Sequence, residues 1–284
     1  MNKKKDLSLV NCLATSMLAY FLTIPLHELF HALTDLAYGN GVACFSAGGV
    51  NPIEIVAYET LSPFHRIMLA GGSASILNVI IGAVLLIVLL KTQMGPMTRV
   101  FLVQLMGGHL SEGIGYFLIG GLFCAGDWGL VFSHLTELPG LVTGLRIGLA
   151  ALGAVGIVGT FFALNYMSYY FIEDADNRKE RLGVAFRLHL LMVIVGYAVG
   201  MTITLLSPMN ATGELSPLLG FLYNMVWITF FWGFMFTGVM KVLPPKKSRF
   251  LYKLPAEPRV PLWIAAVLVI GFDIFVLGPG LFFG

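Results

Sequence analysis

The sequence predicts an all-α, polytopic membrane protein: a bundle of about seven transmembrane helices, with a short membrane-associated hairpin or re-entrant segment after the first. Of its 284 residues, 57% are hydrophobic and only 11% are charged, and the mean hydropathy is +0.86. Apolar runs of roughly twenty residues or more recur along the chain, and each is long enough to cross the hydrocarbon core of a bilayer. A soluble fold is therefore excluded.

The predicted spans follow one another without an inserted soluble domain, so residues 1–284 are expected to form a single membrane domain. Between the first two spans, residues 41–63 are too rich in Gly, Pro and Asn for a span and too apolar for a solvated loop. They are predicted to form the hairpin or re-entrant segment and to line a cavity. The seven spans cover residues 7–37, 67–90, 100–124, 141–171, 188–206, 218–242 and 261–283.

Positive charges collect on alternate connecting segments. With seven spans, 15 of the 17 Lys and Arg residues fall on one side of the membrane, and only Arg66 and Arg146 fall on the other. Since basic residues gather on the cytoplasmic side, this predicts a multi-pass cell-membrane protein with its N-terminus in the cytoplasm and its C-terminus outside. An even number of spans would destroy the pattern.

The first span contains His27-Glu28-Leu29-Phe30-His31, an HExxH motif. On a helix, positions i and i+4 lie on one face, so His27 and His31 can present their imidazoles to one zinc ion. Glu28 lies beside them and can take a proton from a zinc-bound water, which makes it the predicted catalytic base. The simpler alternative is a pair of histidines at the wet end of a membrane helix. Intramembrane His and Glu are rare, however, unless they have a function or a partner.

A catalytic zinc site needs a third protein ligand and an open position for water. His27 lies 22 residues beyond Lys5, roughly 33 Å along a helix and therefore near the outer end of the first span. Asp127 ends the third span on the same outer side. Glu112 lies 13 residues past Arg99, roughly 20 Å along a helix and near mid-membrane. Depth therefore favours Asp127 as the third ligand, with Glu112 as the runner-up.

Other polar residues in the spans are candidates for supporting roles. Asp35 lies one turn beyond His31 on the HExxH face, so it is expected to orient His31 or Glu28, or to contact substrate. Asn78 is expected either to hold substrate or to form a hydrogen bond between helices. His109 and Glu112, spaced i and i+3, are expected to pair with one another.

Together these residues resemble the site-2 protease family of intramembrane zinc metalloproteases. In that family, an HExxH on one membrane helix and an aspartate at the end of a later helix bind the zinc, and a membrane-embedded hairpin follows the first of these helices. The resemblance covers roughly residues 20–130. Its specific part is HExxH, because the family's Gly-Pro-x-x-Asn pattern is absent and Gly126-Asp127-Trp128-Gly129 replaces the usual Leu-Asp-Gly. The matching pieces are His27, Glu28, His31, residues 41–63, Ala70-Gly71-Gly72-Ser73, Asn78 and Asp127.

The resemblance implies a zinc metalloendopeptidase that hydrolyses peptide bonds in or near transmembrane segments of membrane-protein substrates. Residues 7–130 would form a catalytic core of three spans, and residues 141–284 would supply four accessory spans. A substrate helix must unwind to expose its backbone, and the hairpin would hold it by strand addition. The expected partners are the substrate and the lipid bilayer, with no nucleic acid, and the sequence leaves the oligomeric state open.

Other functions are compatible with the same residues. A transporter or a metal-binding membrane protein could line a path with these groups, and a proteolytically inactive relative could act as a scaffold. Glu28 distinguishes the first two from a protease, because a permease has no reason to set a general base beside two zinc-spaced histidines. The metalloprotease family that processes prenylated proteins also has HExxH, but its later glutamate motif resembles residues 172–176 only loosely.

Overall fold

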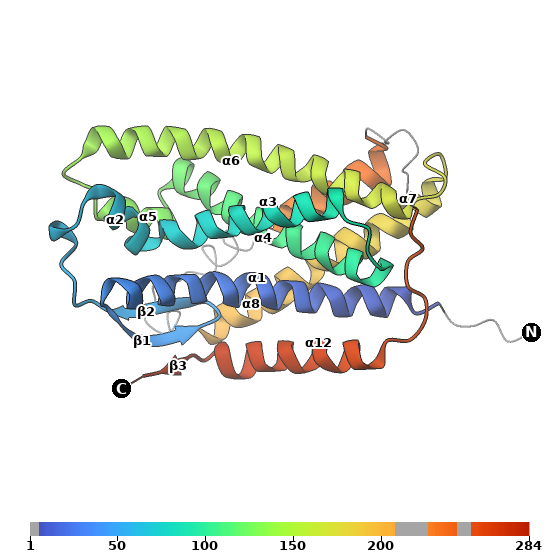
Figure 1. Cartoon of the computed structure of the whole chain (residues 1–284), viewed down its shortest axis with the longest axis horizontal. Coiled ribbons are helices and arrows are strands. Elements are labelled where there is room, and N and C mark those ends of the chain that lie inside the picture. Colours follow the sequence, from blue (N-terminus) through green and yellow to red (C-terminus); the bar gives the residue numbers. More distant parts are fainter. Residues whose placement is uncertain (1–5, 208–226, 243–250, 284) are drawn as a thin grey trace, which may run out of the picture.

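The computed structural model describes residues 6–207, 227–242 and 251–283, which are mostly helical (Figure 1). The helices are α1 (Ser8–Tyr38), α2 (Pro63–Ile67), α3 (Ser73–Lys91), α4 (Pro96–Phe123), α5 (Asp127–Ser133), α6 (Pro139–Ser168), α7 (Arg178–Ala185), α8 (Leu191–Leu206), α11 (Ile228–Phe234) and α12 (Val260–Phe272). Short 3-10 or π turns extend or join them: η1 (Tyr58–Thr60), η2 (Met68–Gly72), η3 (Tyr169–Phe171), η4 (Phe186–Leu190), η6 (Met235–Met240) and η7 (Asp273–Leu277). The strands are β1 (Gly41–Ser46), β2 (Gly49–Ile53) and β3 (Leu281–Phe282).

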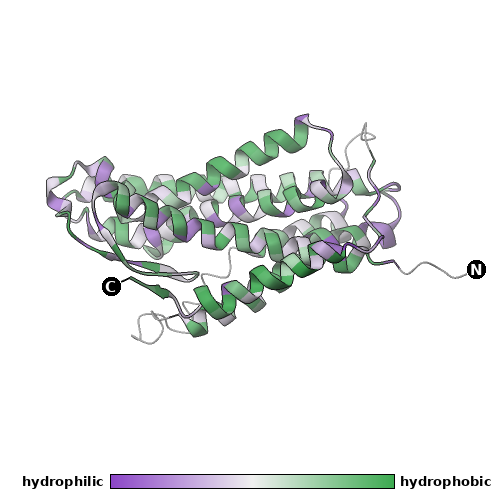
Figure 2. Ribbon diagram, turned by 60° about the horizontal axis from the view of Figure 1, so that its bottom comes forward, coloured by the Kyte–Doolittle hydropathy of each residue, from purple (hydrophilic) through white to green (hydrophobic). Residues whose placement is uncertain are grey.

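Within the described ranges, five continuous helical segments are long and apolar enough to cross a membrane, and a sixth is formed if the bent pair α4 and α5 counts as one span. Hydrophobic residues cover most of the length of these helices (Figure 2). They are the segments expected of a multi-pass membrane protein. The predicted span 218–242 lies partly outside the described residues, and its described part, Ile228–Met240, is a shorter apolar helix. The number seven therefore stays a prediction.

Helix α4 lies at the centre of the bundle and packs against α1, α3 and α6. Glycines allow its backbone to approach its neighbours closely. A Cβ on Gly113 would lie 2.5 Å from the backbone oxygen of Ser75 in α3, and one on Gly121 would lie 2.4 Å from the backbone nitrogen of Ala150 in α6. Because α4 is enclosed in this way, most of its polar side chains are buried: Arg99, Gln104, His109, Ser111 and Glu112.

A small antiparallel sheet follows α1. The helix ends at Gly39, which has a φ of 95° and donates its N–H to the backbone oxygens of Asp35 and Leu36, a left-handed C-cap that suits glycine. β1 and β2 then form a hairpin in the stretch where the sequence predicts one, and β3 pairs with the other edge of β1, in the order β2-β1-β3. The predicted all-α bundle with a hairpin thus also contains a third strand, β3, that was not predicted.

Candidate metal centre

The structure brings His27, His31 and Asp127 together at one point. The Asp127 Oδ2 atom lies 3.2 Å from His27 Nε2 and 3.4 Å from His31 Nε2. The two Nε2 atoms are themselves 3.2 Å apart. His27 and His31 come from adjacent turns of α1, whereas Asp127 is the first residue of α5, so the centre joins elements about a hundred residues apart.

This triangle fits the ligands of one metal ion. With bonds of about 2.0 to 2.2 Å, two ligands of a tetrahedral ion are separated by roughly 3.3 to 3.6 Å. The three distances in the structure lie close to that interval. Two imidazoles and one carboxylate are also a donor set that catalytic zinc sites use. His27, His31 and Asp127 can therefore hold a metal ion.

Asp127 reaches the histidines because the chain turns sharply between α4 and α5. Cys124 adopts a left-handed conformation with a φ of 52°, and Gly126 has a φ of 64°. The two helices are consequently bent by 47° relative to one another. The Ser75 hydroxyl of α3 donates a hydrogen bond of 3.0 Å to Asp127 Oδ2. The carboxylate is thus fixed from a third element.

His27 is also fixed on the side away from Asp127. Its Nδ1 atom lies 2.8 Å from the Asn78 amide nitrogen, and the Asn78 amide oxygen lies 2.8 Å from His109 Nδ1. The Tyr116 ring stacks on the His27 ring, with centroids 5.0 Å apart and planes 19° apart. Asn78, His109 and the His27 ring are all buried. The ring therefore has little freedom to turn.

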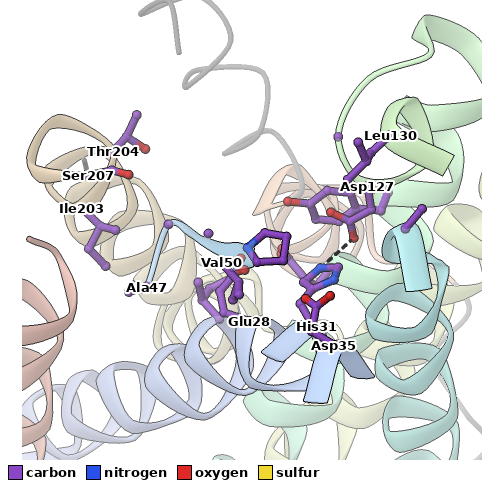
Figure 3. Close-up of a pocket in the computed structure, with 18 of the residues that line it drawn as sticks. Glu28, His31, Asp35, Ala47, Val50, Asp127, Leu130, Ile203, Thr204 and Ser207 are labelled. Atoms are coloured by element: carbon purple, nitrogen blue, oxygen red, sulfur yellow. Dashed lines mark ion pairs between the residues drawn. The ribbon is translucent and has the colours of Figure 1, made fainter. Parts of the chain in front are cut away.

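A cavity of about 350 Å³ opens beside the three residues and contains the predicted base. Glu28, which is 8% exposed, lines it together with His31, Asp127 and Glu112. Figure 3 shows Glu28 and Val50 on one wall, with the α8 residues across from the His31–Asp127 pair. The other walls come from the hairpin and from the end of α8 with the residue after it: Ala47, Gly48, Gly49, Val50, Pro52, Ile203, Thr204 and Ser207.

Tyr58, which precedes the second span, also lines the cavity. Burial raises the pKa of its hydroxyl to about 12, and the nearby carboxylates of Asp35 and Glu54 act in the same direction. At neutral pH the hydroxyl therefore stays protonated. A protonated hydroxyl is a hydrogen-bond donor.

The remaining predicted residues lie near the centre in different roles. Asp35 lines the cavity, but its carboxylate accepts a hydrogen bond from the Asn40 amide, 3.0 Å away, and the structure gives it none to His31 or Glu28. Asn40 in turn accepts from the backbone N–H groups of Ile55 and Val56, 3.0 Å from each. Asp35 thus secures the chain after the hairpin.

The expected pairing of His109 with Glu112 is wrong. His109 Nδ1 bonds Asn78, while the buried Glu112 Oε2 has no hydrogen-bond partner among the described residues. The runner-up ligand Glu112 lines the cavity but does not belong to the His27–His31–Asp127 group. His109 does not pair with Glu112 because it lies against the face of α3 that carries Asn78.

Two contributors were not predicted from the sequence: Ser75, which bonds Asp127, and Tyr116, which stacks on His27. The sequence could have indicated Ser75, since it lies three residues before Asn78 and therefore on the same helix face. It could not have indicated Tyr116, because a lone aromatic residue in an apolar helix is ordinary. Comparison of the chain with protein-family models, with curated proteins and with solved structures finds no match.

Proposed function

We propose that this protein is an intramembrane zinc metalloprotease that hydrolyses peptide bonds in or near the transmembrane segments of membrane-protein substrates. The observation that carries the proposal is the cavity that Glu28 lines together with His31 and Asp127, two members of the ligand triangle. His27, His31 and Asp127 hold the zinc. Glu28 is the general base, because it follows the first ligand directly in sequence and lines the same cavity.

Each residue of the site has a separate role in the proposed reaction. His27, His31 and Asp127 would hold a zinc ion, which would supply Lewis-acid chemistry for a carbonyl group and for water near neutral pH. Glu28 removes the proton from the attacking water and delivers it to the leaving amine. Asn78 and Ser75 keep the ligands in place through His27 and Asp127. The Tyr58 hydroxyl is available as a donor to the substrate backbone.

The substrate segment must be extended where it is cut, because a helical backbone has its polar groups already paired. Strand addition provides the missing partners. β1 is paired on both sides, so β2 and β3 are the edge strands, and β2 is the longer of the two. Gly49, Val50 and Pro52 of β2 line the cavity. We therefore place the substrate strand along β2.

The proposed topology has seven spans, a cytoplasmic N-terminus and an outer C-terminus. The start of α1 and the strand β3 lie at opposite ends of the bundle (Figure 1), as an odd number of spans requires. Gly48 of the hairpin meets Ser207 at one end, whereas Lys241 pairs with Asp176 at the other. The opposite positions of Ser207 and Lys241 support the proposed sixth span between them.

The proposal is tested by measuring zinc content and cleavage of single-pass model substrates by the purified protein and its variants. The wild type should bind one zinc ion per chain and cleave. His27→Ala should lose both properties, and Glu28→Gln should keep the zinc and lose cleavage, because an amide cannot act as the base. His65→Ala, an exposed histidine outside the centre, is the matched control and should behave as the wild type.

Different failures point to different alternatives. Cleavage by Glu28→Gln would overturn the protease mechanism. Stoichiometric zinc in a wild type that cleaves no substrate would favour a metal-binding transporter or an inactive scaffold. A wild type without zinc would remove the metal centre itself.

A further inference from the structure

A single amide lies between two buried imidazoles behind the metal centre. Asn78 of α3 contacts His27 of α1 through its nitrogen and His109 of α4 through its oxygen, each at 2.8 Å. The three residues are 0%, 1% and 1% exposed, respectively. We infer that Asn78 and His109 are positioning residues, which together determine which ring nitrogen of His27 carries the hydrogen. This inference rests on the metal centre proposed above.

The contacts define the hydrogen positions in the structure. The Asn78 nitrogen can only donate, so His27 Nδ1 accepts and the ring hydrogen of His27 is on Nε2. That atom lies 3.2 Å from Asp127 Oδ2 and can donate to it. At the other end, the Asn78 oxygen accepts from the Nδ1–H of His109. In this orientation of the amide, the hydrogen of His27 is on Nε2, the atom nearest to Asp127.

Metal ligation through Nε2 requires the other tautomer of His27. A histidine that binds through Nε2 has its hydrogen on Nδ1, and that hydrogen needs an acceptor. A half-turn of the Asn78 amide puts its oxygen at His27 and its nitrogen at His109. Because an imidazole nitrogen donates in one tautomer and accepts in the other, His109 can pair with the amide in both orientations. His109 is thus the residue that allows Asn78 to turn.

Burial makes this pairing important. A buried polar group without a partner costs roughly 1 to 3 kcal/mol. An apolar residue at position 78 would leave His27 Nδ1 without an acceptor in the loaded state, so it would oppose ligation. Loss of such a supporting hydrogen bond typically weakens metal affinity by about 10- to 100-fold.

The test is zinc affinity, measured by competition with a chelator, together with the absorption spectrum of the Co²⁺-substituted protein. Asn78→Leu should bind zinc about 10- to 100-fold more weakly and show an altered Co²⁺ spectrum. Asn78→Asp should bind about as tightly as the wild type, because a carboxylate oxygen accepts from His27 Nδ1–H. Asn165→Leu is the matched control, since Asn165 is a buried asparagine of α6 that bonds Val242 and Thr237 away from the centre.

Each outcome bears on the inference. Zinc affinity of Asn78→Leu equal to that of the wild type would overturn it and leave the metal centre standing. An Asn78→Asp protein as weak as Asn78→Leu would also overturn it, because the acceptor at His27 would then not matter. Should the leucine variant not fold, Asn78→Ser gives the same comparison, since its side chain is too short to bridge both imidazoles. A wild type without zinc would overturn the metal centre and this inference together.

Discussion

Gly71 leaves the space into which Asp127 fits. A Cβ on residue 71 would lie 2.9 Å from the Asp127 Cβ and 3.1 Å from the Asp127 backbone oxygen, and Gly71 itself has a φ of 140°. Both the contact and the backbone conformation therefore call for glycine. Residues 70–73 are all small, and small residues let a neighbouring helix approach closely. The segment that they admit is the start of α5, which carries the metal ligand.

Gly71→Ala is expected to push Asp127 away from the histidines. Backbone strain at this φ costs roughly 1 to 3 kcal/mol, and the displaced carboxylate should weaken zinc binding by at least about 10-fold, or 1.4 kcal/mol. Chelator competition and thermal unfolding in detergent measure the two effects.

The matched control for this change is Gly144→Ala in α6, where an added Cβ meets no atom within 4 Å. Zinc binding should be unchanged there, and stability should rise slightly because alanine favours helices. Equal zinc affinities in the two variants would contradict the role given to Gly71.

The third ligand can be decided by a pair of carboxylate-to-amide changes. Asp127→Asn should reduce the bound zinc to well below one ion per chain, because the amide is a poor zinc ligand. Glu112→Gln should keep full zinc occupancy, since Glu112 is not part of the ligand triangle. Elemental analysis of the purified proteins provides the measurement. The opposite result would make Glu112 the ligand and leave Asp127 as a surface residue of the cavity.

The local parts of the site could be predicted from the sequence, because helix periodicity alone places His27 and His31 on one face of α1 with Glu28 next to His27. The closeness of Asp127 to them followed from counting residues from the charged end of each span, a depth argument that uses only the helix rise. The carboxylate indeed lies 3.2 Å from His27 Nε2. Its role as a ligand stays a prediction.

Contacts between helices could not be predicted in the same way. Whether His109 meets Glu112 on its own helix or Asn78 on α3 depends on how α3 and α4 are rotated about their axes, which residue spacing does not determine. The pairing of β3 with β1 joins segments more than two hundred residues apart. No local sequence pattern in either strand predicts this pairing.

Ser75→Ala tests the support of Asp127 from α3. The variant removes the hydroxyl that donates to Asp127 Oδ2 at 3.0 Å, and a hydrogen bond to a charged group contributes roughly 1.5 to 3 kcal/mol. We expect zinc affinity to fall about 10-fold without loss of the fold. The control is Ser133→Ala, whose hydroxyl belongs to an exposed residue and donates to the Leu130 carbonyl of its own helix. A larger loss in the control would show that the effect is general to α5.

The topology can be tested with cysteines placed at the two ends of the bundle. Glu59 and Lys179 are exposed, and they lie respectively at the hairpin end and at the α7 end (Figure 1). Since the basic residues collect at the α7 end, that end should face the cytoplasm. In a background with Cys124 replaced by Ser, an impermeant thiol reagent added to intact cells should label Glu59→Cys and spare Lys179→Cys. Labelling of Lys179→Cys alone would invert the orientation, and the metal centre, which lies at the hairpin end of α1, would then open toward the cytoplasm.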